Sequence, residues 1–375
     1  MPVITHDLPD IRPHVDRLLA CAVDAGASDI HLEPVPAGYE VKLRIDGLLQ
    51  AMETCEVPIG RAMVNRLMIM AHLLTYHLDV PQEGRVAANV PPHGTLELRL
   101  SIIPTRHGSR AVLRLPAELI QSHGLHDLNL PPLVVQQLQL FAHSESGMLA
   151  VTGPAGSGKT TTVYALLAHI VQQCPGQSIV SLEDPVERDI PGVTQIEITP
   201  YGEMDYARAM RSLLRQDPQV LALGEIRDAA SASLAMQAAL TGHRLICTMH
   251  AGSPAGALRR WCEMGIEPHQ ISSAVSGLLT QRLLRRKAGP ESDPGRENVG
   301  AIYRGRIPIA QFAVMDAPLR KALLRDGDLM ELEKALTGQK NYLPLRQVAA
   351  EYVNSGVTDQ AEVDRVLGPA TTGGR

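Results

Sequence analysis

One eight-residue segment constrains the fold of this chain more than any other: Gly153-Pro154-Ala155-Gly156-Ser157-Gly158-Lys159-Thr160. It matches the phosphate-binding pattern G-x-x-x-x-G-K-[ST] at every fixed position. The apolar residues before it predict a buried strand, and those after it predict a helix. In that setting the glycines let backbone N–H groups surround an anion, and the helix N-terminus adds its positive dipole end. The segment therefore favours a phosphate site over a glycine-rich turn that binds nothing.

Two side chains of this segment have the chemistry needed for a bound nucleotide. Lys159 would reach the β- and γ-phosphates, and the Thr160 hydroxyl would hold Mg²⁺. The predicted nucleotide-binding residues are Gly153, Gly156, Ser157, Gly158, Lys159, Thr160 and Thr161. A phosphate loop alone does not show what the nucleotide is used for, so the function depends on further clusters of polar residues.

Helices and strands are expected to alternate after residue 131, which is typical of a parallel sheet covered by helices. The expected helices are 131–142, 160–173, 205–216 and 229–241, and the expected strands are 148–152, 178–182, 194–198, 219–223 and 244–249. Before residue 116, short strands and helices indicate a smaller α+β domain. The predicted fold class is α/β, with domains at 1–115, 133–287 and 288–375, a linker at 116–132, and a mostly helical last region.

The bulk composition argues against several functional classes. The formal net charge is −5, so no global field draws the chain to DNA or to anionic lipid. Aromatic residues make up 3% of the chain, which disfavours base-stacking platforms for single strands. No apolar run is long enough to span a membrane, and the polar start does not fit a signal peptide. The five cysteines form no C-x-x-C pair, so we expect reduced cytosolic thiols.

A group of carboxylates follows the expected strand 178–182. Glu183, Asp184 and Glu187 would lie at the C-terminal edge of the parallel sheet. Carboxylates in that position can hold the waters of Mg²⁺ or activate an attacking water. The alternative is an ordinary charged loop that Pro185 closes, but the presence of a phosphate loop favours the functional interpretation.

Two further strands are expected to end in polar residues. The run Val220-Leu221-Ala222-Leu223-Gly224-Glu225 has the Walker B pattern, in which the terminal carboxylate faces the metal. One strand later, His250 is placed to sense the γ-phosphate as a hydrogen-bonding group. His243 is as readily a structural histidine. A metal site from both histidines is not expected, because their spacing fits no usual ligand set.

Taken together, these motifs resemble the secretion ATPases of type II secretion and type IV pilus assembly. The resemblance covers nearly the whole chain. Its segments are Ala27-Ser28-Asp29-Ile30-His31-Leu32-Glu33-Pro34, Leu43-Arg44-Ile45-Asp46-Gly47 and Pro81-Gln82-Glu83-Gly84-Arg85 in the second N-terminal domain, Glu183-Asp184-Pro185-Val186-Glu187 in the Asp box, Gly224-Glu225-Ile226-Arg227-Asp228 in Walker B, Thr241-Gly242-His243 through His250 in the His box, and Tyr303-Arg304-Gly305-Arg306 with 356–367 in the C-terminal domain of assembly-type members.

The resemblance implies a RecA-like P-loop NTPase that hydrolyses ATP with Mg²⁺ and forms a ring hexamer. ATP would sit between two domains of a subunit, and Arg99 and Arg114 would close onto its phosphates as permanently charged forks. The alternative is that both arginines are exposed strand residues that pair with Glu97 and Glu118.

The same resemblance suggests roles for the acidic residues. Glu183 is the expected general base, with Glu187 in support, and Glu225 is expected to orient Mg²⁺ through water. Closure of the N-terminal domain about a hinge in 116–132 would complete the site, and release of phosphate would let the domains part.

We expect a cytoplasmic protein, peripheral on the inner membrane, that passes work to a polytopic inner-membrane platform protein and binds no nucleic acid. Three alternatives stay open. A DNA-transfer ATPase of the same superfamily would use the basic residues 282–287, which are instead expected to cap a helix as a solvated face. A regulatory paralogue would bind nucleotide without hydrolysis, and a retraction motor would withdraw the fibre.

Three departures from the family pattern stand out. Assembly-type members carry two C-x-x-C pairs where this chain has residues 287–298 without a cysteine, so we expect no zinc. The chain starts almost directly at the second N-terminal domain, which puts recruitment through the family's first domain in doubt. Ala251-Gly252 replaces the usual polar pair after His250, a change expected to weaken nucleotide coupling.

Overall fold

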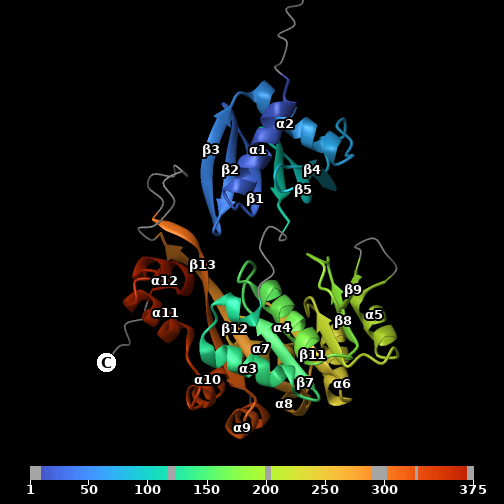
Figure 1. Cartoon of the computed structure of the whole chain (residues 1–375), viewed down its shortest axis with the longest axis vertical. Helices are drawn as coiled ribbons and strands as arrows, with labels where there is room; N and C mark the ends of the chain where they lie inside the picture. The colour runs from blue at the N-terminus through green and yellow to red at the C-terminus, as the bar shows by residue number, and fades with distance from the viewer. Residues whose placement is uncertain (1–9, 117–123, 199–203, 289–301, 326–327, 370–375) are drawn as a thin grey trace, which may run out of the picture. The chain divides into compact units, whose positions relative to one another are not determined.

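The chain forms two compact units in this computed structural model, Met1–Gln121 and Ser122–Arg375 (Figure 1). The structure describes residues 10–116, 124–198, 204–288, 302–325 and 328–369. Most of the cysteine-free stretch at 287–298, part of the expected linker at 116–132, and Glu118 therefore lie outside the described residues.

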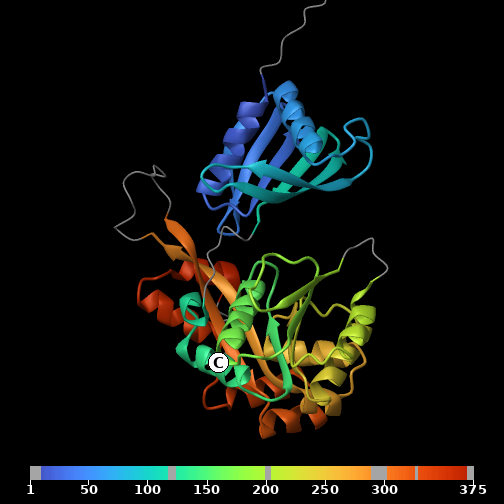
Figure 2. The same cartoon turned by 45° about the vertical axis from the view of Figure 1, so that its right-hand side comes forward.

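The first unit is an antiparallel sheet with two helices across one face (Figure 2). Its strands lie in the order β3-β2-β1-β6-β5-β4. The elements are α1 Arg12–Asp24, β1 Asp29–Val35, β2 Gly38–Ile45, β3 Leu48–Cys55, α2 Val57–Met70, β4 Gln82–Asn89, β5 Thr95–Thr105 and β6 Gly108–Arg114. Alternate residues of β5, such as Leu98 and Leu100, are buried in one core with α1 and α2. This unit is the α+β domain that the sequence predicts.

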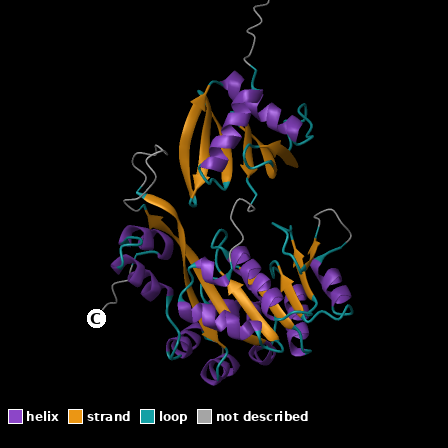
Figure 3. Ribbon diagram, viewed as in Figure 1, coloured by secondary structure: helices purple, strands orange, loops and turns teal. Residues whose placement is uncertain are grey.

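The second unit contains a seven-stranded sheet in the order β13-β12-β7-β11-β10-β8-β9. Its strands are drawn in orange in Figure 3. The pairings from β12 through β9 are parallel, and β13 pairs with β12 antiparallel. The strands are β7 Gly147–Thr152, β8 Ile179–Glu183, β9 Thr194–Glu197, β10 Val220–Leu223, β11 Arg244–Met249, β12 Val275–Lys287 and β13 Tyr303–Val314. Strand β7 lies inside the sheet, between β12 and β11, and every one of its residues is buried.

Helices cover both faces of this sheet. They are α3 Pro132–Ala142, α4 Lys159–Gln173, α5 Tyr206–Leu213, α6 Ala229–Leu240, α7 Pro254–Glu263 and α8 Pro268–Ala274. On β7, Leu149 and Val151 pack in one core with α3 and α4, whereas Met148 and Ala150 pack in another with α5, α6 and α7. Burial on both faces explains the continuous apolar runs of these strands and confirms the predicted α/β architecture.

The C-terminal part is mostly helical, as predicted. Its helices are α9 Ala317–Arg325, α10 Leu329–Thr337, α11 Leu345–Asn354 and α12 Gln360–Leu367. Helices α11 and α12 pack through Val348 and Val363 against Leu284 and Ile309, which lie on β12 and β13.

The expectation that residues 282–287 cap a helix is wrong, because they form the end of β12. Arg285 donates a hydrogen bond to Glu362 at 2.7 Å, and Lys287 Nζ lies 3.6 Å from Asp359 Oδ2. These carboxylates belong to α12 and its N-cap, far along the chain, so a local charge pattern could not reveal them. The domain boundary expected at residue 287 falls between two paired strands of one sheet.

Candidate functional site

The phosphate loop connects the end of β7 to the start of α4, in the strand–loop–helix setting that its pattern requires. Gly156 and Gly158 have φ values of 72° and 86°, in the left-handed region that glycine adopts most readily. At Gly153, a Cβ atom would lie 2.7 Å from the carbonyl oxygen of Gln281, so only glycine fits there. The loop is therefore shaped by its glycines and by the neighbouring strand.

Lys159 lies at the first position of α4 and turns back over the start of the loop. Its Nζ donates to the carbonyl oxygens of Gly153 at 3.0 Å and of Pro154 at 2.9 Å. The pKa of Lys159 lies below its usual value, mainly because the side chain is buried. The negative charge of Glu225 opposes this shift, and the positive charge of Arg282 adds to it. The ammonium group is thus held at the loop by neutral oxygens that an anion can replace.

Three hydroxyl groups accompany the lysine. Thr160 and Thr161 are half-buried in the first turn of α4. Ser157 is buried, and within the described residues its hydroxyl has no hydrogen-bond partner. A buried unsatisfied hydroxyl is unfavourable, and a bound phosphate oxygen would satisfy it.

Strand β12 supports the loop through residues that the sequence analysis did not identify. The side-chain amide of Gln281 donates to the Ser157 carbonyl at 2.6 Å and accepts a hydrogen bond from Thr162 Oγ1 at 2.9 Å. The hydroxyl groups of Thr280 and Thr152 lie 2.6 Å apart. No sequence signal marks these contacts, because they depend on the parallel pairing of β12 with β7.

Glu183 ends β8, and its carboxylate is fully engaged by neighbouring side chains. It accepts hydrogen bonds from Tyr164, Ser181 and Gln195, which come from α4, β8 and β9. Only 6% of the residue is exposed. Burial and the hydrogen bond to Glu183 raise the pKa of Tyr164. A general base needs an oxygen that water can reach, which this buried carboxylate does not offer, so the role expected of Glu183 stays a prediction that the geometry does not support.

Glu187 lies in the turn that follows β8. Its side chain is exposed, and its backbone N–H donates to the Tyr164 hydroxyl at 3.1 Å. Tyr164 therefore links Glu183 to the turn that carries Glu187.

Glu225 follows β10 and is more accessible than Glu183. Its side chain is 19% exposed and accepts a hydrogen bond from Arg227 Nε at 2.8 Å. His250, at the end of neighbouring β11, places Nε2 3.1 Å from Glu225 Oε1. The structure thus brings Glu225 and His250 together, as their positions on adjacent strands predict.

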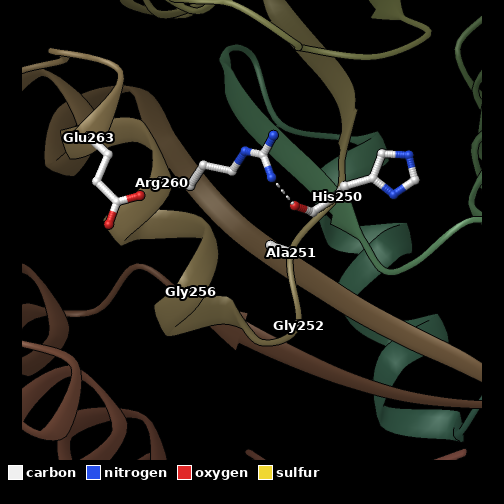
Figure 4. Close-up of a pocket in the computed structure, with 6 residues that line it drawn as sticks. All are labelled: His250, Ala251, Gly252, Gly256, Arg260 and Glu263. Atoms are coloured by element: carbon white, nitrogen blue, oxygen red, sulfur yellow. Dashed lines mark hydrogen bonds between the residues drawn. The ribbon is translucent and has the colours of Figure 1, made fainter.

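The turn after His250 is held by two arginines. Arg260 of α7 donates to the His250 carbonyl at 2.9 Å, and Arg282 of β12 donates to the Gly252 carbonyl at 3.0 Å. A cleft of about 330 Å³ lies beside this turn, lined by His250, Ala251, Gly252, Gly256, Arg260 and Glu263. Figure 4 shows the His250 ring directed away from Arg260 and Glu263.

Arg99 and Arg114 belong to the first unit, where they face each other on paired strands β5 and β6. Arg114 forms an ion pair with Asp29 at 3.2 Å. Glu97, the partner considered for them, lies 3.9 Å from Arg85 instead. In the described part of the chain, no carboxylate pairs with Arg99.

The donors at the loop suit Mg²⁺, which keeps several waters and takes few protein ligands, all oxygen. Thr160 offers a hydroxyl and Glu225 a carboxylate. Among the residues that the structure describes, no three His, Cys, Asp or Glu side chains converge as a metal site. The expectation of no zinc concerns a stretch mostly outside those residues and stays a prediction.

A phosphate loop on a central parallel strand, with an acidic residue ending a nearby strand, defines a P-loop protein with a RecA-like core. Solved structures share this fold. The ATPase DotB of Legionella pneumophila aligns with a TM-score of 0.76 and 20% identity over 94% of this chain and 95% of DotB. The pilus retraction motor PilT with bound ADP aligns with a TM-score of 0.68 and 22% identity over 95% of this chain and 97% of PilT.

The chain belongs to the Type II/IV secretion system protein family, whose model matches residues 5–365. It is 36% identical over 375 residues to the type II secretion system protein HxcR of Pseudomonas aeruginosa, covering 96% of this chain and 78% of HxcR. It is 35% identical over 367 residues to the type IV pilus assembly ATPase PilB of Thermus thermophilus, covering 90% of this chain and 41% of PilB. The family that the motifs predict is therefore confirmed.

In the described parts of the chain, no helix combines the length and the apolar character needed to cross a membrane.

Proposed function

We propose that this chain is a Mg²⁺-dependent ATPase that powers assembly of a type II secretion pseudopilus or a type IV pilus. The observation that carries the proposal is the phosphate loop. Lys159 donates to its carbonyl oxygens, and the charge of Glu225 affects the pKa of this lysine. Membership of the secretion family and the similarity to HxcR and PilB support the cellular role.

In this proposal, water attacks the γ-phosphorus in line while the bond from that phosphorus to the β–γ bridging oxygen breaks, so that ADP and phosphate leave. The chain positions the reactants and stabilises charge. The loop N–H groups and Lys159 hold the phosphates. Glu225 accepts the proton of the attacking water, and His250 keeps that carboxylate oriented. Bound Mg²⁺ would be held by Thr160 and, through water, by Glu225, and would neutralise charge on the β- and γ-phosphates.

Glu183 has a positioning role in this proposal. Its carboxylate fixes the Tyr164 hydroxyl, and that hydroxyl accepts the backbone N–H of Glu187. The exposed side chain of Glu187 stays the supporting carboxylate of the site.

Arg99 and Arg114 are proposed as the cations that act on the phosphates. Like charges on directly opposed residues of paired strands are destabilising. A bound phosphate would relieve this repulsion. It would supply the negative charge that Arg99 does not receive from a carboxylate of the described residues.

We further propose a homo-hexamer on the cytoplasmic face of the inner membrane that acts on a polytopic platform protein. A hinge in 116–132 would permit the cycle. The contacts of the basic run 282–287 argue against a nucleic-acid partner, because Arg285 and Lys287 form ion pairs with carboxylates of the C-terminal part.

Phosphate release from Mg-ATP tests the proposal. Lys159→Ala should abolish turnover, because the lysine contacts the transferred phosphate. Lys321→Ala is the matched control, since Lys321 is an exposed residue of α9. Turnover of Lys159→Ala at the level of the control would rule the proposed function out.

A further inference from the structure

We propose that Arg282 is a positioning residue of the hydrolytic site, and that the nucleotide's phosphates supply the negative charge this cation lacks. The inference rests on the proposed function. In the sequence, Arg282 is marked only as part of the basic run 282–287.

Arg282 lies directly beside the phosphate loop. It follows Gln281, whose amide donates to the Ser157 carbonyl, and its own Nη1 donates to the Gln281 carbonyl at 2.9 Å. That carbonyl oxygen lies 2.7 Å from the place where a Cβ on Gly153 would be. The guanidinium group therefore donates directly to an oxygen that packs against Gly153, the first glycine of the loop.

The other side of the guanidinium group reaches the turn after β11. Its Nη2 donates to the Gly252 carbonyl at 3.0 Å. Gly252 lies two residues after His250, and the His250 ring contacts Glu225 at 3.1 Å. Arg282 thus connects the strand that supports the loop to the turn that carries the histidine.

The protein does not balance the charge of Arg282. Within the described part of the chain, no carboxylate forms an ion pair with it, and burial lowers its pKa. Lys159, the other cation at the loop, donates to carbonyl oxygens, and Glu225 is the carboxylate whose charge acts on it. One carboxylate leaves an excess of positive charge at two partly buried cations, which is unfavourable unless a further anion joins them. A bound polyphosphate is such an anion.

The charge and the shape of the guanidinium group have separable effects. A lysine at this position keeps the charge, but its single ammonium group lacks the rigid planar fork that donates to two carbonyls. We therefore expect the charge to control affinity for the triphosphate. The fork should control the placement of His250 and Glu225, and hence the rate of turnover.

Three variants of the full chain separate these effects: Arg282→Gln, Arg282→Lys and, as a matched control, Arg286→Gln, an exposed arginine of the same strand. Affinity is measured with the non-hydrolysable analogue AMP-PNP and Mg²⁺, turnover by phosphate release, and folding by Tm. Arg282→Gln should lose about 10-fold or more in affinity and about 10- to 100-fold in kcat, the range expected for charge-assisted hydrogen bonds. Arg282→Lys should recover most of the affinity and little of the kcat, and Arg286→Gln should match the wild type.

Wild-type affinity and turnover in Arg282→Gln would overturn the inference. Full recovery of kcat in Arg282→Lys would also overturn it, because the fork would then be unnecessary. Equal losses of affinity and kcat in Arg282→Gln and Arg282→Lys, together with a lowered Tm in both, would overturn it as well, because they would indicate a structural role. These results leave the proposed function standing. Wild-type protein that binds no AMP-PNP would overturn both.

Discussion

Glu183 and Glu225 occupy equivalent places in the chain and different places in the structure. Glu183 is the last residue of β8, Glu225 follows β10 by two residues, and these parallel strands are neighbours. Glu183 is buried beneath three side-chain donors, whereas Glu225 is partly exposed beside Arg227 and His250. The comparison shows that carboxylates at neighbouring strand ends can differ in burial, and only the one within reach of water suits the general base that we propose.

The largest expected effect is that of Glu225→Gln on turnover. Loss of a general base typically lowers kcat by about 10²- to 10⁴-fold, while the nucleotide still binds through the loop. Phosphate release and AMP-PNP affinity measure the two quantities, and Glu263→Gln, in the nearby cleft, is the control. A kcat within threefold of the wild type would remove Glu225 from the chemistry.

Glu183→Ala should act mainly on folding. It leaves the hydroxyl groups of Tyr164 and Ser181 without an acceptor and removes one of the two acceptors of the Gln195 amide, at a cost of about 2–4 kcal/mol in the free energy of unfolding. Tyr164→Phe should cost about 1–3 kcal/mol, because it removes the hydrogen bond to Glu183 and the one from the Glu187 backbone N–H. Denaturant unfolding measures both values. Complete loss of turnover with unchanged unfolding would restore Glu183 as the general base.

Glu362 extends the comparison to a buried carboxylate that cations hold. Burial alone would raise its pKa, but hydrogen bonds from Arg365 and Arg285 outweigh burial and lower the pKa from 4.5 to about 2. Its contribution to stability is therefore present above pH 4.5 and is lost as the pH falls towards 2. The Tm of the wild type should fall more steeply over that range than the Tm of Glu362→Gln. Parallel curves would contradict the assignment.

The smallest expected effect is that of Arg227→Ala on stability. Arg227 contacts Glu225 and Asp184, yet its side chain is 59% exposed. Exposed ion pairs contribute about 0–1 kcal/mol, so the free energy of unfolding should fall by less than about 1 kcal/mol. A loss comparable to that of Glu183→Ala would mean that the two strand ends are equally structural.

The phosphate loop, its flanking elements and the contact between Glu225 and His250 were predictable from sequence. Each rests on a local pattern, namely fixed glycine spacing, apolar runs, or the equivalent ends of neighbouring parallel strands. The helical C-terminal part was also predictable from local sequence pattern.

The role of β12 was not predictable in the same way. Gln281 contacts Ser157, over a hundred positions earlier in the chain, and Arg282 contacts Gly252, thirty positions earlier. The residues next to them in sequence therefore give no indication of these contacts. The three donors to Glu183 likewise come from three separate elements. A buried, hydrogen-bonded carboxylate and a partly exposed one have the same sequence pattern.

The central claim is that this chain hydrolyses ATP at the phosphate loop, and phosphate release by the wild-type protein tests it most directly. Turnover per subunit is measured over a range of protein concentrations, with Mg²⁺ and with EDTA. We predict Mg²⁺-dependent release whose rate per subunit rises with protein concentration, as a ring would require. Nucleotide binding without phosphate release at any concentration would contradict it and favour a regulatory paralogue that binds nucleotide without hydrolysis.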